Sequence, residues 1–519
     1  MLLGDILRRN AKLFPDKTAV IFRDKRCSYR ELNDRVKRLA NGLKAKGIEK
    51  GDKVGLLEHP CPQYIELYIA IPKIGAVLTP LNCRLAGREL EFIINDAEVK
   101  MLIMGEEFVD IVRSIRSNLK TVDSFFCLGK SMSDMGAYED MIEKYSTDAP
   151  HVDIEDEDVA VQMYTSGTTG RPKGVLLTHK NLILMYMSRI IDLKLDQNDV
   201  FLSSLPFFHT AAEYALITLY IGGALVIHSS FDPGRFLEAI EKERVTVTGG
   251  VPAMVNFLLQ HMEKHPRDYD FSSLRIFAYG AAPMPVTLAR RTIETFKCDI
   301  YQSYGITEAS PGVTLLRPED HVLDGSDEKA RRLASCGKEI FNVEVRVVDG
   351  EGVDVRHGEV GEIIVRSDSV MKGYWKLPKE TAETIRDGWL HTGDMGTVDE
   401  KGYIFIVDRR KDMIISGGEN IYPREVEEVL YTHTAILEAA VIGIPDEKWG
   451  ESVKAFVVLK EGKKVSEDEI IDFCKKNMAS YKKPKSVEFV DALPRNPVGK
   501  VLKKELREKY WKGYGRRVS

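Results

Sequence analysis

The sequence Tyr164-Thr-Ser-Gly-Thr-Thr-Gly-Arg-Pro-Lys-Gly174 lies between two β-rich apolar runs, residues 159–164 and 175–179. From Thr165 onward it carries four hydroxyl side chains, three glycines and two cations. Glycines let the backbone bend tightly and approach a ligand closely. Hydroxyls, exposed N–H groups and Lys173 supply the donors that a polyphosphate requires. The composition alone fits a plain surface hairpin about as well as a phosphate-binding loop. The order of the residues therefore has to distinguish these two interpretations.

That order excludes two common nucleotide-binding motifs. A P-loop requires G-x-x-x-x-G-K-S/T, which the spacing from Gly167 to Lys173 does not fit, and no G-x-G-x-x-G occurs in the chain. The stretch matches S/T-S-G-S/T-T-G-x-P-K-G at every position. It therefore resembles the phosphate loop of the adenylate-forming enzymes, which comprise acyl-CoA synthetases, luciferases and peptide-synthetase adenylation domains. The resemblance implies that ATP contacts Thr165, Ser166, Gly167, Thr168, Thr169, Gly170 and Lys173.

Length, charge and cysteine usage narrow the class of protein. A chain of 519 residues exceeds the size of a single core, so more than one domain is expected. With 74 basic and 79 acidic residues and a net charge of -5, no nucleic-acid partner is indicated. The seven cysteines form no C-x-x-C pair, which argues against a zinc site or a disulfide framework and for a reducing compartment.

The cellular location is expected to be the cytoplasm. The charged N-terminus, residues 1–10, is not typical of a signal peptide. The longest apolar run, near residues 214–227, is too short and too interrupted by glycine to span a bilayer. We expect no transmembrane segment, whereas peripheral membrane contact and a dimeric state stay open.

The N-terminal part alternates strand and helix patterns. Residues 18–22 and 52–57 have the composition of strands. Between them, Ser28-Tyr-Arg-Glu31 is a capping box that opens a helix, and Gly47 ends that helix. This rhythm predicts an α/β fold in which mixed, mostly parallel sheets are covered by helices.

The domain organisation follows from the same pattern and from the resemblance. A β-rich stretch at residues 343–365 predicts a β-rich subdomain. We expect a large N-terminal domain at residues 1–409, which holds ATP and the acyl group. A small, mobile α+β domain at residues 410–519 is expected to carry a catalytic lysine.

A second strong motif is Tyr304-Gly-Ile-Thr-Glu308, which matches Y-G-x-T-E. An aromatic ring offers a face on which adenine can stack, and Gly305 permits close approach of the backbone. Thr307 can donate to the α-phosphate, and Glu308 can hold Mg²⁺, which prefers carboxylate, water and phosphate oxygens. The alternative is a surface strand end with a chance Thr-Glu pair, which the family match makes the weaker interpretation.

The acyl pocket is predicted from two segments. A lone histidine is more often a packing residue than a catalytic one, but Pro206-Phe-Phe-His209 resembles the family segment whose His borders the acyl carboxylate. The glycine turn Gly249-Gly250-Val251 resembles the segment that lines the acyl chain, and its alternative role is sheet packing. Glu213 departs from the apolar residue expected along a fatty-acyl tunnel, so it either faces away or marks a polar end of the substrate.

The remaining nucleotide contacts are implied by the resemblance. Gly280-Ala281-Ala282-Pro283 resembles the segment that lies along adenine. Asp394 resembles the Asp that accepts hydrogen bonds from the ribose hydroxyls, although a lone Asp after Gly is otherwise a turn former. Arg409 matches the Arg that also contacts ribose.

The C-terminal part carries the hinge and the third strong motif. Lys411 matches the hinge position, where a few residues absorb large dihedral changes. The loop with Gly417, Gly418 and Glu419 resembles the one that lines the CoA channel. Lys500 ends a P-x-x-x-x-G-K motif and matches the catalytic lysine, whereas a single lysine on a polar loop is ordinarily a solvated charge.

The resemblance covers essentially the whole chain and implies an ATP-dependent acyl-CoA synthetase that uses Mg²⁺ and CoA. The catalytic residues that it implies are Lys500, Thr307, His209 and Glu308. The segments around Gly249, Gly280 and Asp446 look most like bacterial fatty-acyl-CoA ligases, which implies a medium- or long-chain fatty acid. The alternatives are a benzoate-like aromatic-acid CoA ligase, an enzyme that loads a carrier protein and, from a different class, a nucleotide-binding regulator without turnover.

Overall fold

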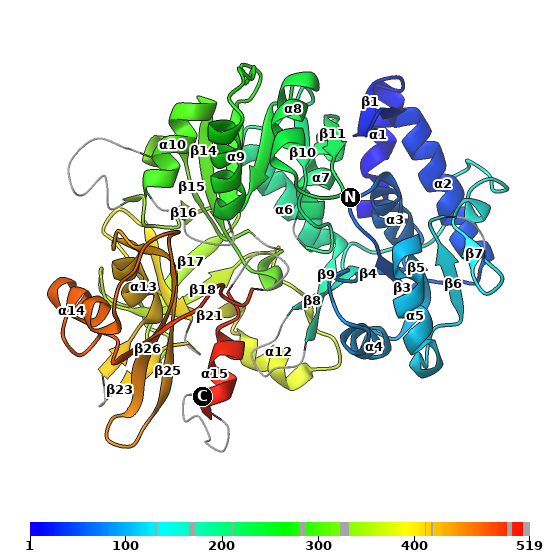
Figure 1. The fold of residues 1–519 in the computed structure, drawn as a ribbon. Helices are drawn as coiled ribbons and strands as arrows, with labels where there is room; N and C mark the ends of the chain where they lie inside the picture. Colours follow the sequence, from blue (N-terminus) through cyan, green and yellow to red (C-terminus); the bar gives the residue numbers. More distant parts are fainter. Residues whose placement is uncertain are drawn as a thin grey trace. The chain divides into compact units, whose positions relative to one another are not determined.

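The computed structural model describes residues 1–129, 132–165, 172–209, 211–280, 284, 286–310, 312–321, 332–409, 412–416, 419–495 and 501–511. The chain divides into two compact units (Figure 1). The first comprises Met1–Val345 and Val365–Leu390, and the second comprises Arg346–Ile364 and His391–Ser519. The predicted division at residues 409 and 410 stays a prediction.

The first unit contains a sheet of nine strands within the described residues, in the order β16-β15-β14-β13-β12-β10-β11-β1-β2. Its strands are β1 Thr18–Phe22, β2 Lys25–Ser28, β10 Val200–Ser203, β11 Ala224–Ile227, β12 Val247–Gly250, β13 Ile276–Gly280, β14 Asp299–Tyr304, β15 Thr314–Leu316 and β16 Lys338–Glu339. In this order, the strands from β14 to β1 run parallel to one another. The edge strands pair antiparallel: β2 at one edge, and β15 and β16 at the other.

An eight-stranded sheet in the same unit has the order β19-β9-β8-β4-β3-β5-β6-β7 within the described residues. Its strands are β3 Lys53–Leu57, β4 Val77–Pro80, β5 Val99–Met104, β6 Ser124–Cys127, β7 Gly136–Ala137, β8 Val159–Thr165, β9 Lys173–Thr178 and β19 Gly373–Tyr374. β8 and β9 form an antiparallel pair in which Thr165 lies opposite Lys173. The predicted strands on both sides of the phosphate loop are therefore present, and residues 166–171 of the loop lie outside the described residues.

Helices separate and cover these sheets, as the alternating pattern predicts. They are α1 Ile6–Leu13, α2 Tyr29–Ala45, α3 Pro62–Lys73, α4 Gly87–Asp96, α5 Val109–Ile115, α6 His179–Asp192, α7 Ala211–Ile221, α8 Pro233–Lys242, α9 Pro252–Lys264, α10 Val286–Phe296 and α12 Pro378–Thr384. The predicted capping box opens α2, where the Glu31 N–H donates to Ser28 Oγ over 3.2 Å and the Ser28 N–H donates to Glu31 Oε2 over 2.7 Å. Gly47 follows α2 with a φ of 84°, as expected for a residue that ends a helix.

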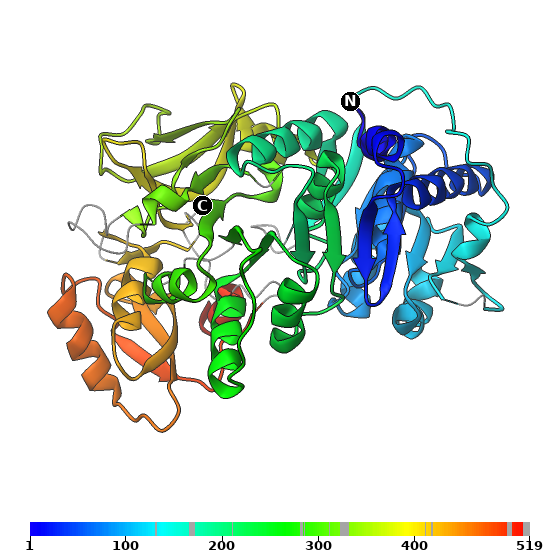
Figure 2. The same ribbon diagram turned by 90° about the horizontal axis from the view of Figure 1, so that it is seen from above.

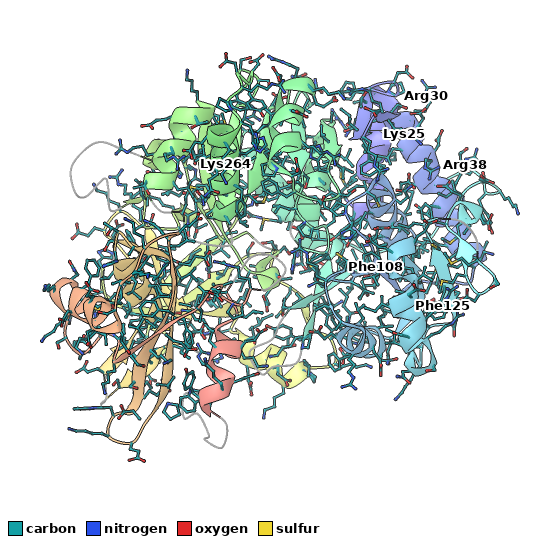
Figure 3. All side chains as sticks on the ribbon, viewed as in Figure 1. Lys25, Arg30, Arg38, Phe108, Phe125 and Lys264 are labelled. Carbon is teal, nitrogen blue, oxygen red and sulfur yellow. The ribbon has the colours of Figure 1, made fainter. Side chains whose placement is uncertain are left out.

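Three hydrophobic clusters form the core of this unit. The largest joins α2, α3, α6 and α7, which pack around β3, β4, β8 and β9. α2 also packs against β1 and β2 (Figure 2). A smaller cluster includes Phe108, which precedes α5, and Phe125 of β6, both labelled in Figure 3. The rigid core places the strand ends that carry the predicted site.

The β-rich segment forms a five-stranded sheet within the described residues, in which β17, β18, β21 and β20 are neighbours in this order and β22 pairs with β21. The strands are β17 Glu344–Val348, β18 Gly361–Arg366, β20 Ile385–Arg386, β21 Trp389–Val398 and β22 Ile404–Arg409. This sheet confirms the predicted β-rich subdomain.

The C-terminal segment is α+β, as predicted. Its sheet joins β23 Ile414–Ser416, β24 Glu419–Ile421, β25 Ile436–Asp446, β26 Gly450–Leu459 and β27 Ser486–Phe489. Its helices are α13 Pro423–Tyr431, α14 Glu467–Asn477 and α15 Lys503–Trp511. Ser466 caps α14. Among the described helices of the whole chain, none has the length and hydropathy needed to cross a membrane.

Candidate active site

Four adjacent parallel strands of the nine-stranded sheet end at the same edge. The strands β10, β12, β13 and β14 end at Ser203, Gly250, Gly280 and Tyr304, and the segments predicted to bind the acid and adenine follow these ends. Because carboxyl ends of parallel strands meet at one edge, the fold brings together segments that lie far apart in the sequence. This edge is the position at which open α/β sheets bind ligands.

The glycines of these segments are required by strand packing. A Cβ at Gly249 would lie 2.8 Å from the carbonyl oxygen of Ala278, and a Cβ at Gly280 would lie 2.6 Å from that of Ser303. Both distances are too short for a real side chain. Gly250 is less constrained, since its Cβ would approach only Met254, at 3.2 Å. Val251 precedes α9 as its N-cap residue, and residues 281–283 lie outside the described part of the chain.

The Y-G-x-T-E motif leaves β14 at Tyr304 and continues into a short 3-10 helix, Thr307–Ala309. Glu308 Oε1 accepts a hydrogen bond of 2.9 Å from the hydroxyl of Tyr374, a residue that no sequence motif marks. The Nζ of Lys173 lies 4.8 Å from the centroid of the same tyrosine ring. The structure therefore brings the predicted phosphate-loop lysine and the predicted metal ligand to one tyrosine.

Tyr374 is held by backbone pairing. It belongs to β19, and it lies opposite Val175 of β9 in an antiparallel pair. The neighbouring Trp375 N–H donates to the Gly174 carbonyl over 2.7 Å. Burial, followed by the Glu308 carboxylate, raises the pKa of Tyr374, so its hydroxyl keeps its proton and remains a donor to Glu308.

His209 lies just before α7 and is partly buried. Its ring centroid is 4.7 Å from that of Phe208. Burial and, secondarily, the charge of Arg84 lower the pKa of His209 to about 4. A neutral imidazole can donate one hydrogen bond and accept another, but it brings no fixed positive charge to a carboxylate.

The predicted ribose contacts lie opposite each other in the second unit. Asp394 of β21 pairs with Arg409 of β22 in the antiparallel register. Asp394 is 4% exposed, and its N–H donates to Thr392 Oγ1 over 3.0 Å. Glu362 accepts from His391 Nδ1 over 2.9 Å and from the Gly393 N–H over 3.1 Å, so it fixes the backbone before Asp394. Nothing in the sequence around Glu362 marks it as a functional residue.

The hinge and CoA segments are only partly described. Glu419 lies on β24 opposite Ser416. Asp408, next to the hinge, accepts a hydrogen bond of 2.9 Å from the Arg424 N–H. Lys411, Gly417, Gly418 and Lys500 were predicted to act here and lie outside the described residues.

The donor set fits a magnesium ion bound together with a nucleotide. Among the described residues, no group of three or more His, Cys, Asp and Glu side chains has the geometry to hold a metal. Mg²⁺ with a nucleotide does not need such a group, because one or two carboxylates, water and the phosphates complete its shell. Glu308 is a suitable carboxylate, and Tyr374 orients it.

Comparison with known proteins gives the family. Residues 7–375 match the AMP-binding enzyme family, and residues 425–500 match the AMP-binding enzyme C-terminal domain. The chain belongs to the AMP-binding enzyme family.

Two curated relatives align with this AMP-binding enzyme over almost its whole length. A feruloyl-CoA synthase of an Amycolatopsis species is 42% identical over 98% of this chain and 99% of its own. The long-chain-fatty-acid–CoA ligase FadD13 of Mycobacterium tuberculosis is 37% identical over 98% of each chain.

Solved structures agree with this assignment. The crystal structure of ATP-bound MatB from Rhodopseudomonas palustris superposes with a TM-score of 0.88 and 32% identity, and covers 99% of this chain and 100% of its own. The predicted family and fold class are confirmed. This AMP-binding enzyme is an adenylate-forming acyl-CoA ligase, a class of enzymes that uses ATP, Mg²⁺ and CoA.

The lowered pKa of His209 can be measured directly. We expect its imidazole to titrate with a midpoint near 4 in NMR spectra of the folded enzyme, with the resonance assigned by comparison with His209→Asn. The pKa of His209 is lowered because burial disfavours the charged imidazolium form. The reference is the pKa of about 6.5 that a histidine has in an unfolded chain. A midpoint close to 6.5 would show that the ring is solvated.

The hydrogen bond from Tyr374 predicts a specific effect on metal use. In Tyr374→Phe, Glu308 loses its orienting donor, so the Mg²⁺ concentration for half-maximal activity should rise about 10-fold or more. Tyr29→Phe is the matched control, because it removes another tyrosine hydrogen bond, to the Gly223 carbonyl, outside the candidate site. Equal Mg²⁺ dependence in wild type and Tyr374→Phe would remove Glu308 from the metal site.

Proposed function

We propose that this enzyme activates a carboxylic acid with ATP at the carboxyl edge of β10, β12, β13 and β14, and then transfers the acyl group to CoA. The observation that carries the proposal is the convergence of Lys173 and Glu308 on Tyr374, beside the segments that follow these strand ends. Two motifs that are distant in sequence thereby supply a cation and a carboxylate to one region. Both groups are what a metal-bound polyphosphate requires.

In the first step, a carboxylate oxygen of the acid attacks the α-phosphorus, and the bond to the bridging oxygen of pyrophosphate breaks. Negative charge shifts onto the departing pyrophosphate and the oxygens of the phosphorus, so fixed donors and cations lower the barrier. Lys500, Thr307 and the hydroxyls of residues 165–169 are proposed to supply them. Mg²⁺ held by Glu308 would neutralise phosphate charge when bound. The neutral His209 borders the acid without adding a charge.

In the second step, the thiol of CoA attacks the acyl carbonyl, its proton is lost, and AMP leaves. We propose that the C-terminal segment turns about Lys411 between the steps, as its resemblance to the family hinge implies. This movement withdraws Lys500 and brings Gly417, Gly418 and Glu419 to the CoA channel. Asp394 and Arg409 are proposed to hold the ribose in both steps, which their opposed register supports.

The acid is proposed as a medium- or long-chain fatty acid, in line with the sequence prediction and with the relative FadD13. An aromatic acid is the second candidate, since the relative with 42% identity is a feruloyl-CoA synthase. A third relative, the fatty acid–acyl-carrier-protein ligase ScoC of Streptomyces coeruleorubidus, is 35% identical and supports a test with carrier protein as acceptor.

Exchange of labelled pyrophosphate into ATP tests the first step. We expect exchange that depends on an acid from a panel of fatty, aromatic and short acids, followed by thioester formation with CoA. Lys500→Ala should lower exchange by about 100-fold or more, the usual scale for loss of an electrostatic donor. The same variant should still form thioester from a supplied acyl-adenylate.

Three results would contradict parts of this proposal. Exchange with no acid of the panel would indicate a nucleotide-binding regulator. Equal loss of both partial reactions in Lys500→Ala would refute its role in adenylation. Transfer to a phosphopantetheinyl protein without transfer to CoA would identify carrier loading as the second step.

A further inference from the structure

Helix α7 carries a carboxylate where the surrounding helix is apolar. Glu213 lies in the first turn of α7, and its neighbours Ala211, Ala212, Ala215 and Leu216 are buried in the largest hydrophobic cluster. The Glu213 side chain is itself buried, with 3% exposure. A buried carboxyl group is costly unless its oxygens find hydrogen-bond partners.

Glu213 lacks such a partner at one of its oxygens. Its Oε1 has no hydrogen bond to any residue that the structure describes. Burial raises the pKa of Glu213 to about 8, and the Arg189 guanidinium on α6 opposes this shift only in part. The carboxyl group is therefore mostly protonated near neutral pH, so it can both donate and accept a hydrogen bond.

Two buried tyrosines share this environment. Tyr68 of α3 and Tyr186 of α6 have no solvent exposure, and their hydroxyls are likewise unpartnered within the described part of the chain. After burial, the Glu213 carboxylate raises the pKa of each phenol. Helix α7, which carries Glu213, packs against both α3 and α6. The three helices thus bury hydrogen-bonding groups, without partners among the described residues, in the largest hydrophobic cluster.

Helix α3 contains a second buried carboxylate, Glu66, whose oxygens do have hydrogen-bond partners. Glu66 is 3% exposed, as Glu213 is. Its oxygens accept hydrogen bonds of 2.6 Å and 3.1 Å from Arg35 and 2.7 Å from the Tyr138 hydroxyl. The groups around Glu213 differ from Glu66, because they have hydrogen-bonding capacity that no described residue uses.

Aromatic packing connects this region to the segment of His209. The Tyr64 ring, one helical turn before Tyr68, lies 6.2 Å from it and meets the Phe207 ring edge-on at 5.6 Å. Phe208 contacts His209 at 4.7 Å, and α7 begins two residues later, at Ala211. A substrate whose carboxylate lies at His209 therefore lies near the start of α7, and Glu213 is in the first turn of that helix.

We propose that Glu213, Tyr68 and Tyr186 form a subsite that binds a hydroxyl group at the far end of the acid. This inference rests on the proposed function, because it places the carboxylate of the acid at His209. A phenolic or aliphatic hydroxyl donates to one of these groups and accepts from another. A purely apolar tail leaves all three unpaired, and sites built to bind a hydroxyl reject such analogues strongly. Glu213 and the two tyrosines thus determine specificity for acids with a polar end.

Matched pairs of acids test the subsite. The probes are 4-hydroxycinnamate with cinnamate, 4-hydroxybenzoate with benzoate, and ω-hydroxydodecanoate with dodecanoate. For at least one pair, wild-type kcat/KM should favour the hydroxylated acid about 10-fold or more. The pair with the largest ratio distinguishes an aromatic from an aliphatic substrate.

Variants assign the preference to the subsite. Glu213→Leu should lower the ratio of the preferred pair about 10-fold or more, and Tyr68→Phe and Tyr186→Phe should lower it in the same direction. Glu213→Gln, which resembles the protonated carboxyl group, should keep the ratio within about threefold of wild type. Glu66→Gln is the control at a buried, partnered glutamate and should leave the ratio unchanged. Because each ratio compares two acids on one variant, a loss of folded enzyme cancels.

Two outcomes overturn the subsite while the proposed function stands. One is exchange and thioester formation with both members of every pair at equal kcat/KM. The other is an unchanged ratio in Glu213→Leu, Tyr68→Phe and Tyr186→Phe. Exchange with no acid at all overturns the subsite together with the proposed function.

Discussion

The parallel register of β10, β12, β13 and β14 is the constraint on which the rest of the site depends. It places the ends of four strands, and the segments that follow them, at one edge of a buried sheet. Close strand contact at this edge leaves no room for a Cβ at Gly249 or Gly280. The loops that leave these ends can therefore vary in chemistry while the scaffold below them stays rigid.

A second feature, the contact of Tyr374 with both Lys173 and Glu308, brings a cation and a carboxylate to one region. Tyr374 belongs to a two-residue strand that pairs with β9, and so its position follows from the same strand that carries Lys173. Its hydroxyl fixes Glu308, and its ring lies beneath the Lys173 ammonium group. One side chain thus couples the phosphate-loop strand to the motif after β14. An adenylate-forming site needs this coupling, because the metal and the phosphates have to be held together.

Much of this arrangement could be predicted from sequence. The strands around the phosphate loop, the capping box at Ser28 and the α+β C-terminal segment depend on local sequence patterns, and such patterns can be read from a single chain. Tyr374 and Glu362 were missed, because each acts through a partner distant in sequence and has no spacing of its own. Glu213 was noticed as a departure, but its direction and its missing hydrogen bond required the packing of α3, α6 and α7.

The most direct measurement is a crystal structure of the full chain with an ATP analogue that cannot be cleaved, together with Mg²⁺. We predict adenine beside Gly280 and Tyr304, and a metal ion on the carboxylate of Glu308. We also predict phosphates within reach of Lys173. A nucleotide bound at the opposite edge of the nine-stranded sheet, or held without Glu308 and Lys173, would contradict these predictions.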